Sequence, residues 1–267
     1  MTKNTGRPDL DILLLGTLEY LQAIDLQRSL ADEIAAGRQP DTLLLLEHQH
    51  CYTFGSRGDE NNLLWDSSQL ENKGISVHWS DRGGDVTYHG PGQLVGYPLL
   101  ALGSVRQDGR LPKADYVGFL RKLEKTIIRA LAAHGVVSGQ IEDLTGVWVQ
   151  PDFASRCPRC PPQARKRPAK IASIGVKVDA HGISQHGFSI NIDPEMSYWE
   201  GIIACGLADY PAISISQLIE PAPSMEDMVL SVSQAFVEVF GYEAQRNAVL
   251  THPQSLTGGD LDRKGNR

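Results

Sequence analysis

The chain has 267 residues, of which 41% are hydrophobic and 21% charged, a composition typical of soluble globular proteins with room for a sizeable core. Its formal net charge of −7 argues against a protein whose whole surface binds nucleic acid. The N-terminal apolar run Ile12–Leu15 is too short for a signal peptide or a membrane span, and four cysteines without a secretory signal indicate a reducing compartment. We therefore expect a cytoplasmic protein that acts on neither nucleic acid nor membrane.

Strands and helices alternate irregularly over the first hundred residues. Asp11–Gly16 predicts a short strand, and Thr17 is expected to cap a helix that runs to about Ala36, where Gly37 ends it. Asn61–Leu70 is expected to form a short helix. Further strands, separated by polar or glycine turns, are expected at Thr42–Glu47, Ile75–Trp79, Val86–His89 and Leu94–Leu100.

Two further helices carry clear signals. Lys113–His134 has one apolar stripe and is stopped by Gly135. Met225–Phe240 follows Ser224, and Asp227 completes a capping-box pattern with that serine. The stripe of the first helix consists of Tyr116, Phe119, Leu120, Leu123, Ile127, Ala130 and Leu131.

The remaining strands indicate the fold class. Val147–Val149 predicts one strand, and Lys170–Val178 and Ile183–Ile192 are expected to pair across the hairpin signal Asp179–Gly182. Helices scattered among strands with hairpin connections favour an α+β fold over a doubly wound parallel sheet.

We expect a single domain over residues 1–250, because no repeat and no linker divides the chain, and a disordered tail over residues 251–267. Residues 151–169 are rich in proline and basic residues and are expected to form an exposed insertion between two strands. The insertion contains Cys157 and Cys160. A zinc site needs about four ligands and one CxxC supplies two, so a plain loop is the favoured interpretation.

The most unusual segment is Asp81–Pro98, DRGGDVTYHGPGQLVGYP. Its glycines allow the backbone to approach a ligand closely or to adopt positive φ, and its Arg, Tyr and His side chains supply donors. It contains neither the G-x-x-x-x-G-K-[ST] of a Walker A loop nor a dinucleotide fingerprint. Composition alone leaves two interpretations open: a glycine-rich hairpin whose polar groups are satisfied internally, and a ligand-binding loop.

Two further segments contain reactive side chains. Lys170 begins an expected strand in which Lys170, Ala172 and Ile174 share one face, and such a lysine is either solvated or directed into a cleft. Cys205 lies in GIIACGLADYP and is either a buried small hydrophobe or a nucleophile. The attacking species is a thiolate, so a working Cys205 needs a nearby cation, for which Lys170 and the histidines of Lys170–Ile192 are candidates.

Together these segments resemble the lipoyl(octanoyl) transferases, in the same order and spacing over residues 40–220. Ser189 stands where the family usually has alanine, and the insertion at 151–169 has no counterpart in the family pattern. The family pattern R-G-G-x-x-T-Y-H-G-P-G-Q-L-V-x-Y-P is matched at Arg82–Pro98, K-I-A-x-[IL]-G at Lys170–Gly175, H-G-[FL]-[AS]-[IL]-N at His186–Asn191 and C-G-[IL] at Cys205–Leu207.

The resemblance implies an α+β fold with a mixed β-sheet flanked by helices, like the catalytic domain of biotin and lipoate protein ligases. It implies transfer of an octanoyl group from octanoyl-acyl carrier protein to a lysine of lipoyl domains. The implied acceptors are the lipoyl domains of 2-oxoacid dehydrogenase complexes and the glycine cleavage H protein. No cofactor and no metal are implied, since the donor itself carries phosphopantetheine.

The resemblance also assigns roles to residues. Cys205 falls on the cysteine that takes the acyl group as a thioester, and Lys170 on the lysine that favours its thiolate. Cys51 is interpreted as a packing residue, and the basic run 165–167 is either a docking site for the acidic carrier protein or a solvated charge run. The matches to the family's substrate-binding residues are Arg82, Gly83, Gly84, Asp85, Val86, Thr87, Tyr88, His89, Ser173, Ile174, Gly175, Gly187, Phe188 and Ser189.

Three alternatives remain open. An ATP-dependent lipoate–protein ligase of the same fold would use no catalytic cysteine. A Cys/His thioesterase would release free octanoate without an acceptor lysine. A non-catalytic module that binds acyl groups or carrier proteins would have no need of both Lys170 and Cys205.

Overall fold

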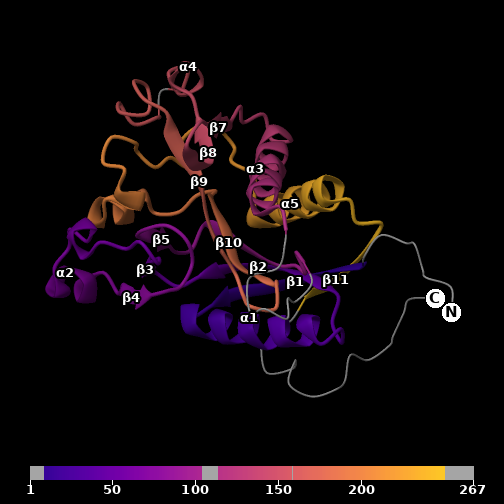
Figure 1. Ribbon diagram of the computed structural model, residues 1–267. Helices are drawn as coiled ribbons and strands as arrows, with labels where there is room; N and C mark the ends of the chain where they lie inside the picture. Colours follow the sequence, from indigo (N-terminus) through magenta and orange to yellow (C-terminus); the bar gives the residue numbers. More distant parts are fainter. Residues whose placement is uncertain (1–8, 104–113, 158, 250–267) are drawn as a thin grey trace, which may run out of the picture.

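The computed structural model describes residues 9–103, 114–157 and 159–249 (Figure 1). The first residue of the expected helix Lys113–His134 and the expected tail 251–267 lie outside these ranges. None of the helices within the described ranges combines the length and the hydropathy needed to cross a lipid bilayer.

A mixed sheet of eight strands runs through the molecule in the order β11-β1-β2-β6-β10-β9-β8-β7 (Figure 1). The strands β11, β1 and β2 are parallel to one another, and the other neighbouring pairs are antiparallel. The mixed sheet expected from the sequence is therefore confirmed. The strands are β1 (Asp9–Leu18), β2 (Asp41–His48), β6 (Gln93–Leu99), β7 (Gly139–Ile141), β8 (Leu144–Val149), β9 (Ala169–Val178), β10 (Ser184–Asn191) and β11 (Ala244–Val249).

A second, smaller sheet has the strand order β4-β3-β5, with β3 (Cys51–Phe54), β4 (Ser76–Trp79) and β5 (Thr87–His89). The sequence analysis did not predict β3, because all of its residues are buried and the apolar–polar alternation that marks a half-exposed strand is missing. Tyr52 and Phe54 of β3 form a small separate core with Val86 and Tyr88.

Helices cover both faces of the large sheet. Figure 1 shows α1 (Tyr20–Ala35) on one side and α3 (Tyr116–Ala132) and α5 (Met225–Phe240) on the other. Successive residues of a strand point to opposite faces of the sheet. The consecutive leucines of β2 therefore pack against the helices on both faces. Leu43 and Leu45 join the core cluster that contains α3 and α5, whereas Leu44 and Leu46 join the cluster that contains α1.

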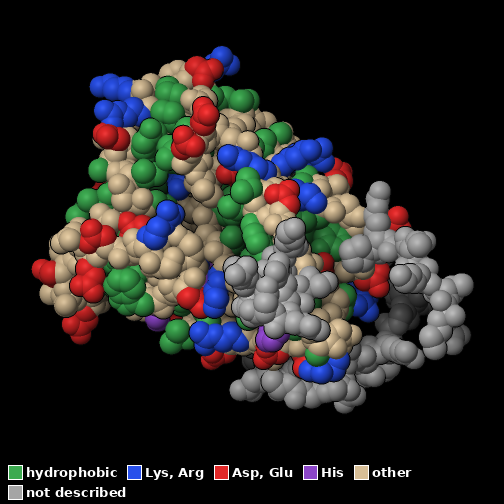
Figure 2. All heavy atoms as spheres, in the orientation of Figure 1, with side chains coloured by type: hydrophobic (Ala, Val, Ile, Leu, Met, Phe, Trp, Pro, Cys, Tyr) green, Lys and Arg blue, Asp and Glu red, His purple; other side chains and the backbone are tan. Residues whose placement is uncertain are grey.

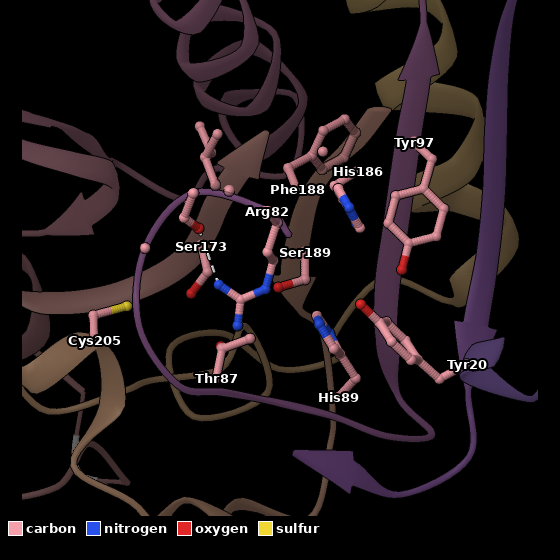
Figure 3. A pocket seen from close by; sticks show the side chains of 15 residues that line it. Tyr20, Arg82, Thr87, His89, Tyr97, Ser173, His186, Phe188, Ser189 and Cys205 are labelled. Carbon is pink, nitrogen blue, oxygen red and sulfur yellow. Dashed lines mark hydrogen bonds between the residues drawn. The ribbon is translucent and has the colours of Figure 1, made fainter. Parts of the chain in front are cut away.

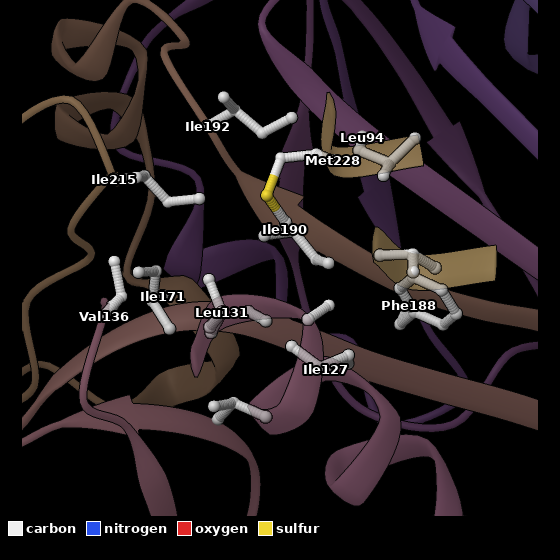
Figure 4. Packing of buried hydrophobic residues seen from close by; sticks show 14 of the residues in the cluster. Leu94, Ile127, Leu131, Val136, Ile171, Phe188, Ile190, Ile192, Ile215 and Met228 are labelled. Carbon is white, nitrogen blue, oxygen red and sulfur yellow. The ribbon is translucent and has the colours of Figure 1, made fainter. Parts of the chain in front are cut away.

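The core under α3 and α5 is the larger of the two (Figure 4). Ile127 and Leu131 of α3 and Met228 of α5 meet Phe188 and Ile190 of β10, all of them at most 2% exposed. Full burial of a side chain of this size contributes about 1.5–3 kcal/mol. This packing fixes β10, which also lines the candidate site.

The start of α1 differs from expectation. Thr17 was expected to cap the helix, but Thr17 and Leu18 continue β1 by pairing with β2, and Glu19 occupies the cap position without a side-chain hydrogen bond. Pairing with a neighbouring strand therefore overrides the local capping preference of threonine.

The prediction of a single short helix at Asn61–Leu70 is wrong. The segment contains the 3-10 helix η1 (Glu60–Asn62) and then α2 (Ser67–Asn72). Between them Leu63 forms a β-bridge with Ile202, and the Leu64 amide donates to the Gly201 carbonyl at 2.8 Å. These backbone groups pair with a segment distant in sequence. They are therefore not available for the hydrogen bonds of one continuous helix.

Other local expectations are confirmed. The hairpin β9–β10 is antiparallel, and Ser224 and Asp227 form both hydrogen bonds of the capping box at the start of α5. The long helix expected at Lys113–His134 is present as α3, but it begins at Tyr116 and ends at Ala132. It starts later than expected because Asp115 caps it, its carboxylate accepting from the Gly118 amide at 2.7 Å.

The insertion over residues 151–169 is only partly exposed, contrary to expectation. It contains α4 (Pro151–Ala154), and Cys157 and Cys160 are 9% and 2% exposed and belong to the large core. Both thiols donate to the carbonyl oxygen of Gln217, at 2.9 and 3.3 Å. The segment is anchored because these small side chains fill the core while its basic residues point outward.

Candidate active site

A pocket with about 460 Å³ of empty space, including its mouth, lies between the glycine-rich loop before β5 and the strands β9 and β10 (Figure 3). The structure brings together most of the predicted site residues here. Those that line the pocket are Arg82, Gly83, Gly84, Thr87, His89, Ser173, Ile174, Gly175, Gly187, Phe188, Ser189 and Cys205.

Four predicted residues lie elsewhere. Lys170 and Asp85 line an adjoining open cleft of about 1110 Å³, and Cys205 borders both spaces. Val86 and Tyr88 alternate with Thr87 along the chain and therefore point away from the pocket, into the small core. The nucleophile candidate thus sits where the cleft and the pocket meet.

Lys170 and Cys205 are in direct contact. Lys170 Nζ lies 3.3 Å from Cys205 Sγ and 4.9 Å from the centre of the Trp148 ring. The lysine is 8% exposed, and no carboxylate within the described residues lies at ion-pair distance from it. Its backbone is held on both sides, because its amide donates to the Pro211 carbonyl and its carbonyl accepts from the Ile213 amide.

Cys205 has an unusual backbone conformation. It lies in the 3-10 helix η3 (Ala204–Gly206) with φ 56° and ψ 20°, in the left-handed region. A non-glycine residue in such a region costs about 1–3 kcal/mol and persists only where its surroundings hold it. Here the Cys205 amide donates to the Val86 carbonyl at 2.9 Å, which ties the cysteine to the strand that carries Thr87 and His89.

Arg82 is a buried cation in the pocket wall, 8% exposed. Its Nε and Nη2 donate to the Thr53 hydroxyl at 3.2 and 2.9 Å, Nη2 also donates to the Thr53 carbonyl, and Nη1 donates to the Gly83 carbonyl at 3.0 Å. Burial lowers the pKa of the guanidinium, although arginine stays protonated at any ordinary pH. Neutral oxygens satisfy its N–H groups, so its positive charge favours an anion in the pocket.

The glycine-rich loop packs directly on β9. The Gly83 amide donates to the Val176 carbonyl at 3.0 Å. A Cβ on Gly175 would lie 2.7 Å from the Gly83 carbonyl oxygen, so only glycine permits this approach.

A chain of hydrogen bonds fixes the tautomer of His89. The Asn191 amide nitrogen donates to the Ile213 carbonyl at 3.0 Å, so its oxygen accepts from Gln93 Nε2 at 2.9 Å. Gln93 Nε2 also donates to the Tyr88 carbonyl, which leaves Gln93 Oε1 to accept from His89 Nδ1 at 2.7 Å. Nε2 of His89 is therefore the acceptor nitrogen. Complete burial, with a contribution from His48, lowers the pKa of His89 to about 3, and the ring is neutral at physiological pH.

His186 closes another side of the pocket. Its Nε2 donates to Asp81 at 2.8 Å, and Lys177 donates to the other oxygen of the same carboxylate. Partial burial by itself raises the pKa of Asp81, but the hydrogen bonds from Lys177 and His186 outweigh it and lower that pKa to about 2. Burial lowers the pKa of His186 despite this carboxylate, so the ring is neutral and donates its single N–H.

Comparison with known proteins identifies the family. The model of the lipoyl protein ligase A/B catalytic domain matches residues 19–237. An octanoyltransferase of Chloroflexus aurantiacus is 37% identical over 240 residues, which cover 90% of this chain and 98% of the relative. An octanoyltransferase of Solibacter usitatus is 38% identical over 236 residues, covering 88% and 95%. The chain belongs to the octanoyltransferase family.

Solved structures that resemble this octanoyltransferase-family chain include lipoate–protein ligases. A bipartite lipoate protein ligase from Thermoplasma acidophilum superimposes with a TM-score of 0.66 at 15% identity, covering 94% of this chain and 89% of that one. A lipoate–protein ligase A bound with ATP gives 0.63 at 14% identity, covering 94% and 91%. At these identities the likeness shows the fold alone, and it confirms the lipoate-ligase-like fold expected from the sequence.

Membership of the octanoyltransferase family makes the chain an acyltransferase, which removes the non-catalytic module from the alternatives. The geometry also disfavours the Cys/His thioesterase. Among the hydrogen bonds of the described residues, Cys205 Sγ pairs with Lys170, while His89 and His186 pair with Gln93 and Asp81.

Sequence reasoning left three lining residues of this octanoyltransferase-family pocket out of the predicted site, namely His186 and two tyrosines. Tyr20 of α1 and Tyr97 of β6 line it, and Figure 3 shows both at the end opposite Cys205. Tyr20 stands at the start of an amphipathic helix, where a buried tyrosine indicates only packing. The single signal for Tyr97 is its position inside the long Arg82–Pro98 match.

Proposed function

We propose that the chain transfers an octanoyl group from octanoyl-acyl carrier protein to a lysine of a lipoyl domain, through a thioester on Cys205. The observation that carries the proposal is the 3.3 Å contact between Lys170 Nζ and Cys205 Sγ at the mouth of the pocket. Two further findings support it: the curated relatives are octanoyltransferases, and the Thermoplasma ligase of similar fold belongs to a lipoylation system that includes an E2 lipoyl domain. The chemistry described below uses neither metal nor ATP.

The first requirement is a thiolate. An ammonium group at hydrogen-bond distance favours the charged form of a thiol, and Lys170 has no competing carboxylate among the described residues. The buried guanidinium of Arg82 adds a second positive charge at the pocket wall. The proposed reaction therefore starts from a Cys205 thiolate beside a Lys170 ammonium.

In the first half-reaction the Cys205 thiolate attacks the octanoyl thioester. A bond forms between Sγ and the acyl carbon, and the bond from that carbon to the phosphopantetheine sulfur breaks. The departing thiolate takes a proton from the Lys170 ammonium and leaves as the free thiol. One thioester replaces another, so the exchange is nearly thermoneutral, and Lys170 is left neutral.

In the second half-reaction the free amine of the acceptor lysine attacks the acyl carbon. The new C–N bond forms, the C–Sγ bond breaks, and the nitrogen gives a proton to neutral Lys170. The products are the octanoyl amide, the Cys205 thiolate and the Lys170 ammonium, so the starting state is restored. Splitting the transfer in this way is covalent catalysis with ping-pong kinetics.

The two spaces beside Cys205 suit two different parts of the substrates. The enclosed pocket contains Ile174 and Phe188 and offers the acyl chain a mostly backbone and apolar wall. The cleft on the Lys170 side is the proposed path for the phosphopantetheine arm and afterwards for the acceptor lysine. Cys205 borders both, so donor and acceptor reach it in turn from the same side.

A basic surface lies near this cleft and is a candidate docking site for the acidic carrier protein. Figure 2 shows Lys and Arg side chains at the top of the molecule, around α4 and the loop that follows it, interspersed with Asp and Glu side chains. Arg165, Lys166 and Arg167 are exposed there, and Arg167 pairs with Asp209, four residues after Cys205. Charge complementarity of this kind accelerates association.

Lys166→Glu tests the docking site, because it reverses a charge and leaves the contacts of the two arginines intact. We expect a raised KM for the acyl carrier protein, an effect that weakens at high salt, and an unchanged kcat. An unaltered KM at low salt would remove the basic run from the proposal.

The decisive experiment for the reaction is intact mass spectrometry after mixing with octanoyl-acyl carrier protein. We expect one octanoyl adduct that is absent in Cys205→Ala and is discharged by an apo lipoyl domain. Release of free octanoate without the domain would favour the thioesterase. Turnover that requires ATP and free lipoate would favour the ligase.

A further inference from the structure

The end of the pocket away from Cys205 is a thin wall shared with a second cavity. A surface groove of about 720 Å³ lies on its other side. Tyr20 and His186 line both the pocket and the groove. Figure 3 shows Tyr20 and Cys205 at opposite ends of the pocket, with Arg82, Ser189 and His89 between them.

The ring of Tyr20 is held in place by aromatic neighbours. It stacks on His78, with ring centres 5.1 Å apart and an interplanar angle of 26°, and it meets the edge of His48 at 5.5 Å and 67°. The residue is 4% exposed. Packing of the ring against these two histidines therefore holds it in place.

We propose that the Tyr20 ring is the end wall that limits the length of the acyl chain, an inference that rests on the proposed thioester at Cys205. A chain attached to Cys205 and lying in the pocket extends toward Tyr20. Extra methylenes would have to displace a ring that is clamped between two histidines. Dense packing resists such displacement, so the acylation rate falls steeply with each added carbon.

The groove on the far side of Tyr20 determines the expected effect of truncating this side chain. It is lined by Leu21, Ile24 and Trp79 as well as by polar residues, and Leu21 and Trp79 are 57% and 58% exposed. Truncation of Tyr20 would join the pocket to this partly apolar groove. A longer chain would then pass through the gap and bury its tail against apolar side chains.

The test compares Tyr20→Ala with the unmodified chain on octanoyl-, dodecanoyl- and hexadecanoyl-acyl carrier protein, followed by intact mass spectrometry. The ratio of dodecanoyl to octanoyl acylation rates should rise roughly ten-fold or more, since one methylene in an apolar pocket discriminates by roughly 10- to 200-fold. Tyr20→Phe keeps the ring and should keep the chain-length profile. Leu21→Ala changes the groove but not the wall and should also keep it.

Several results would overturn the inference. One is a Tyr20→Ala variant that is folded by circular dichroism and selects octanoyl as strictly as the unmodified chain. Another is a longer-chain profile in His186→Ala but not in Tyr20→Ala, which would make His186 the wall. If Tyr20→Ala does not fold, Tyr20→Leu removes most of the ring while keeping an apolar side chain, and the same change in ratio is required of it.

A binding measurement separates this inference from the proposed reaction. Calorimetric titration with octanoic and dodecanoic acid reports the length of the pocket without any chemistry. Preference for octanoic acid that is lost in Tyr20→Ala supports the wall even if no acyl-enzyme forms. Absence of an adduct on the unmodified chain would instead count against the proposed function.

Discussion

Lys170 Nζ lies 3.3 Å from Cys205 Sγ, although the two residues are 35 positions apart. Lys170 is at the start of β9 and is paired through its backbone to the segment that follows η3. Cys205 is fixed from the other side by the Val86 carbonyl. The backbones of Lys170 and Cys205 are thus held by separate hydrogen bonds, and together these bonds position the two side chains in contact.

Substitution of Lys170 should separate the two half-reactions. Lys170→Ala removes the cation beside the thiolate and the group that carries the proton, so we expect octanoyl adduct formation to slow by about 10²- to 10⁴-fold. Lys170→Arg keeps the charge but does not release a proton at ordinary pH. We expect it to retain more acylation than Lys170→Ala while failing to discharge onto the lipoyl domain. Equal rates for the two variants in both half-reactions would contradict this division of roles.

The strained backbone of Cys205 should cost stability. With φ at 56°, Cys205→Gly relieves the strain whereas Cys205→Ala retains it. We expect the glycine variant to be the more stable by about 1 kcal/mol, which shifts Tm by roughly 2–4 °C in a chain of this size. Both variants lack the thiol and should be inactive. Identical unfolding temperatures would show that the backbone of Cys205 carries no such strain.

Alkylation should distinguish the four cysteines. Cys51 is 1% exposed, and burial raises its pKa to about 12. Burial also raises the pKa of Cys160, to about 11. Burial by itself raises the pKa of Cys157, but hydrogen bonds from Arg159 and Cys160 outweigh it and lower that pKa; this thiol is nevertheless only 9% exposed and donates to the Gln217 carbonyl. Iodoacetamide near pH 7.5 should therefore modify Cys205 first, as peptide mapping would show. Labelling should slow in Lys170→Ala, and it should be unchanged in Cys51→Ser. Preferential modification of Cys51 would contradict the proposed thiolate.

The carboxylate of Asp81 should make stability depend on pH in the acid range. Its pKa is about 2 in the folded chain and about 3.9 when unfolded, so its contribution is complete above about pH 4 and is lost as the pH falls toward 2. The side chain is 52% exposed, so Asp81→Asn should cost less than about 1 kcal/mol at pH 7. Thermal unfolding at pH 7, 5, 4 and 3 should show a difference from the unmodified chain that narrows below pH 4. A difference that stays constant down to pH 3 would assign the effect to something other than this ionisation.

Local sequence signals determined several elements of this protein. The capping box of Ser224 and Asp227 marks the start of α5, and the hairpin signal after Val178 pairs β9 with β10. These succeed because the interactions lie within a few residues of one another. The motif segments also indicated the family and most of the pocket lining, since their residue types and order are visible in the sequence.

Tertiary structure decided the features that depend on distant partners. Pairing with β2 extended β1 through Thr17, a bridge to Ile202 divided the helix expected at Asn61–Leu70, and packing against the core buried Cys157 and Cys160. The strand β11 is short and polar, and it is a strand because β1 accepts it as a parallel neighbour.

The same division applies to the site. The sequence alone shows which reactive groups are present, because chemical reactivity depends on residue type. These groups are Lys170, Cys205 and the glycine-rich loop. Only the fold determined that the lysine meets the thiol and that Tyr20, from an unrelated helix, closes the far end of the pocket. Distance and enclosure are set by packing between elements, and no short stretch of sequence contains both partners of such a contact.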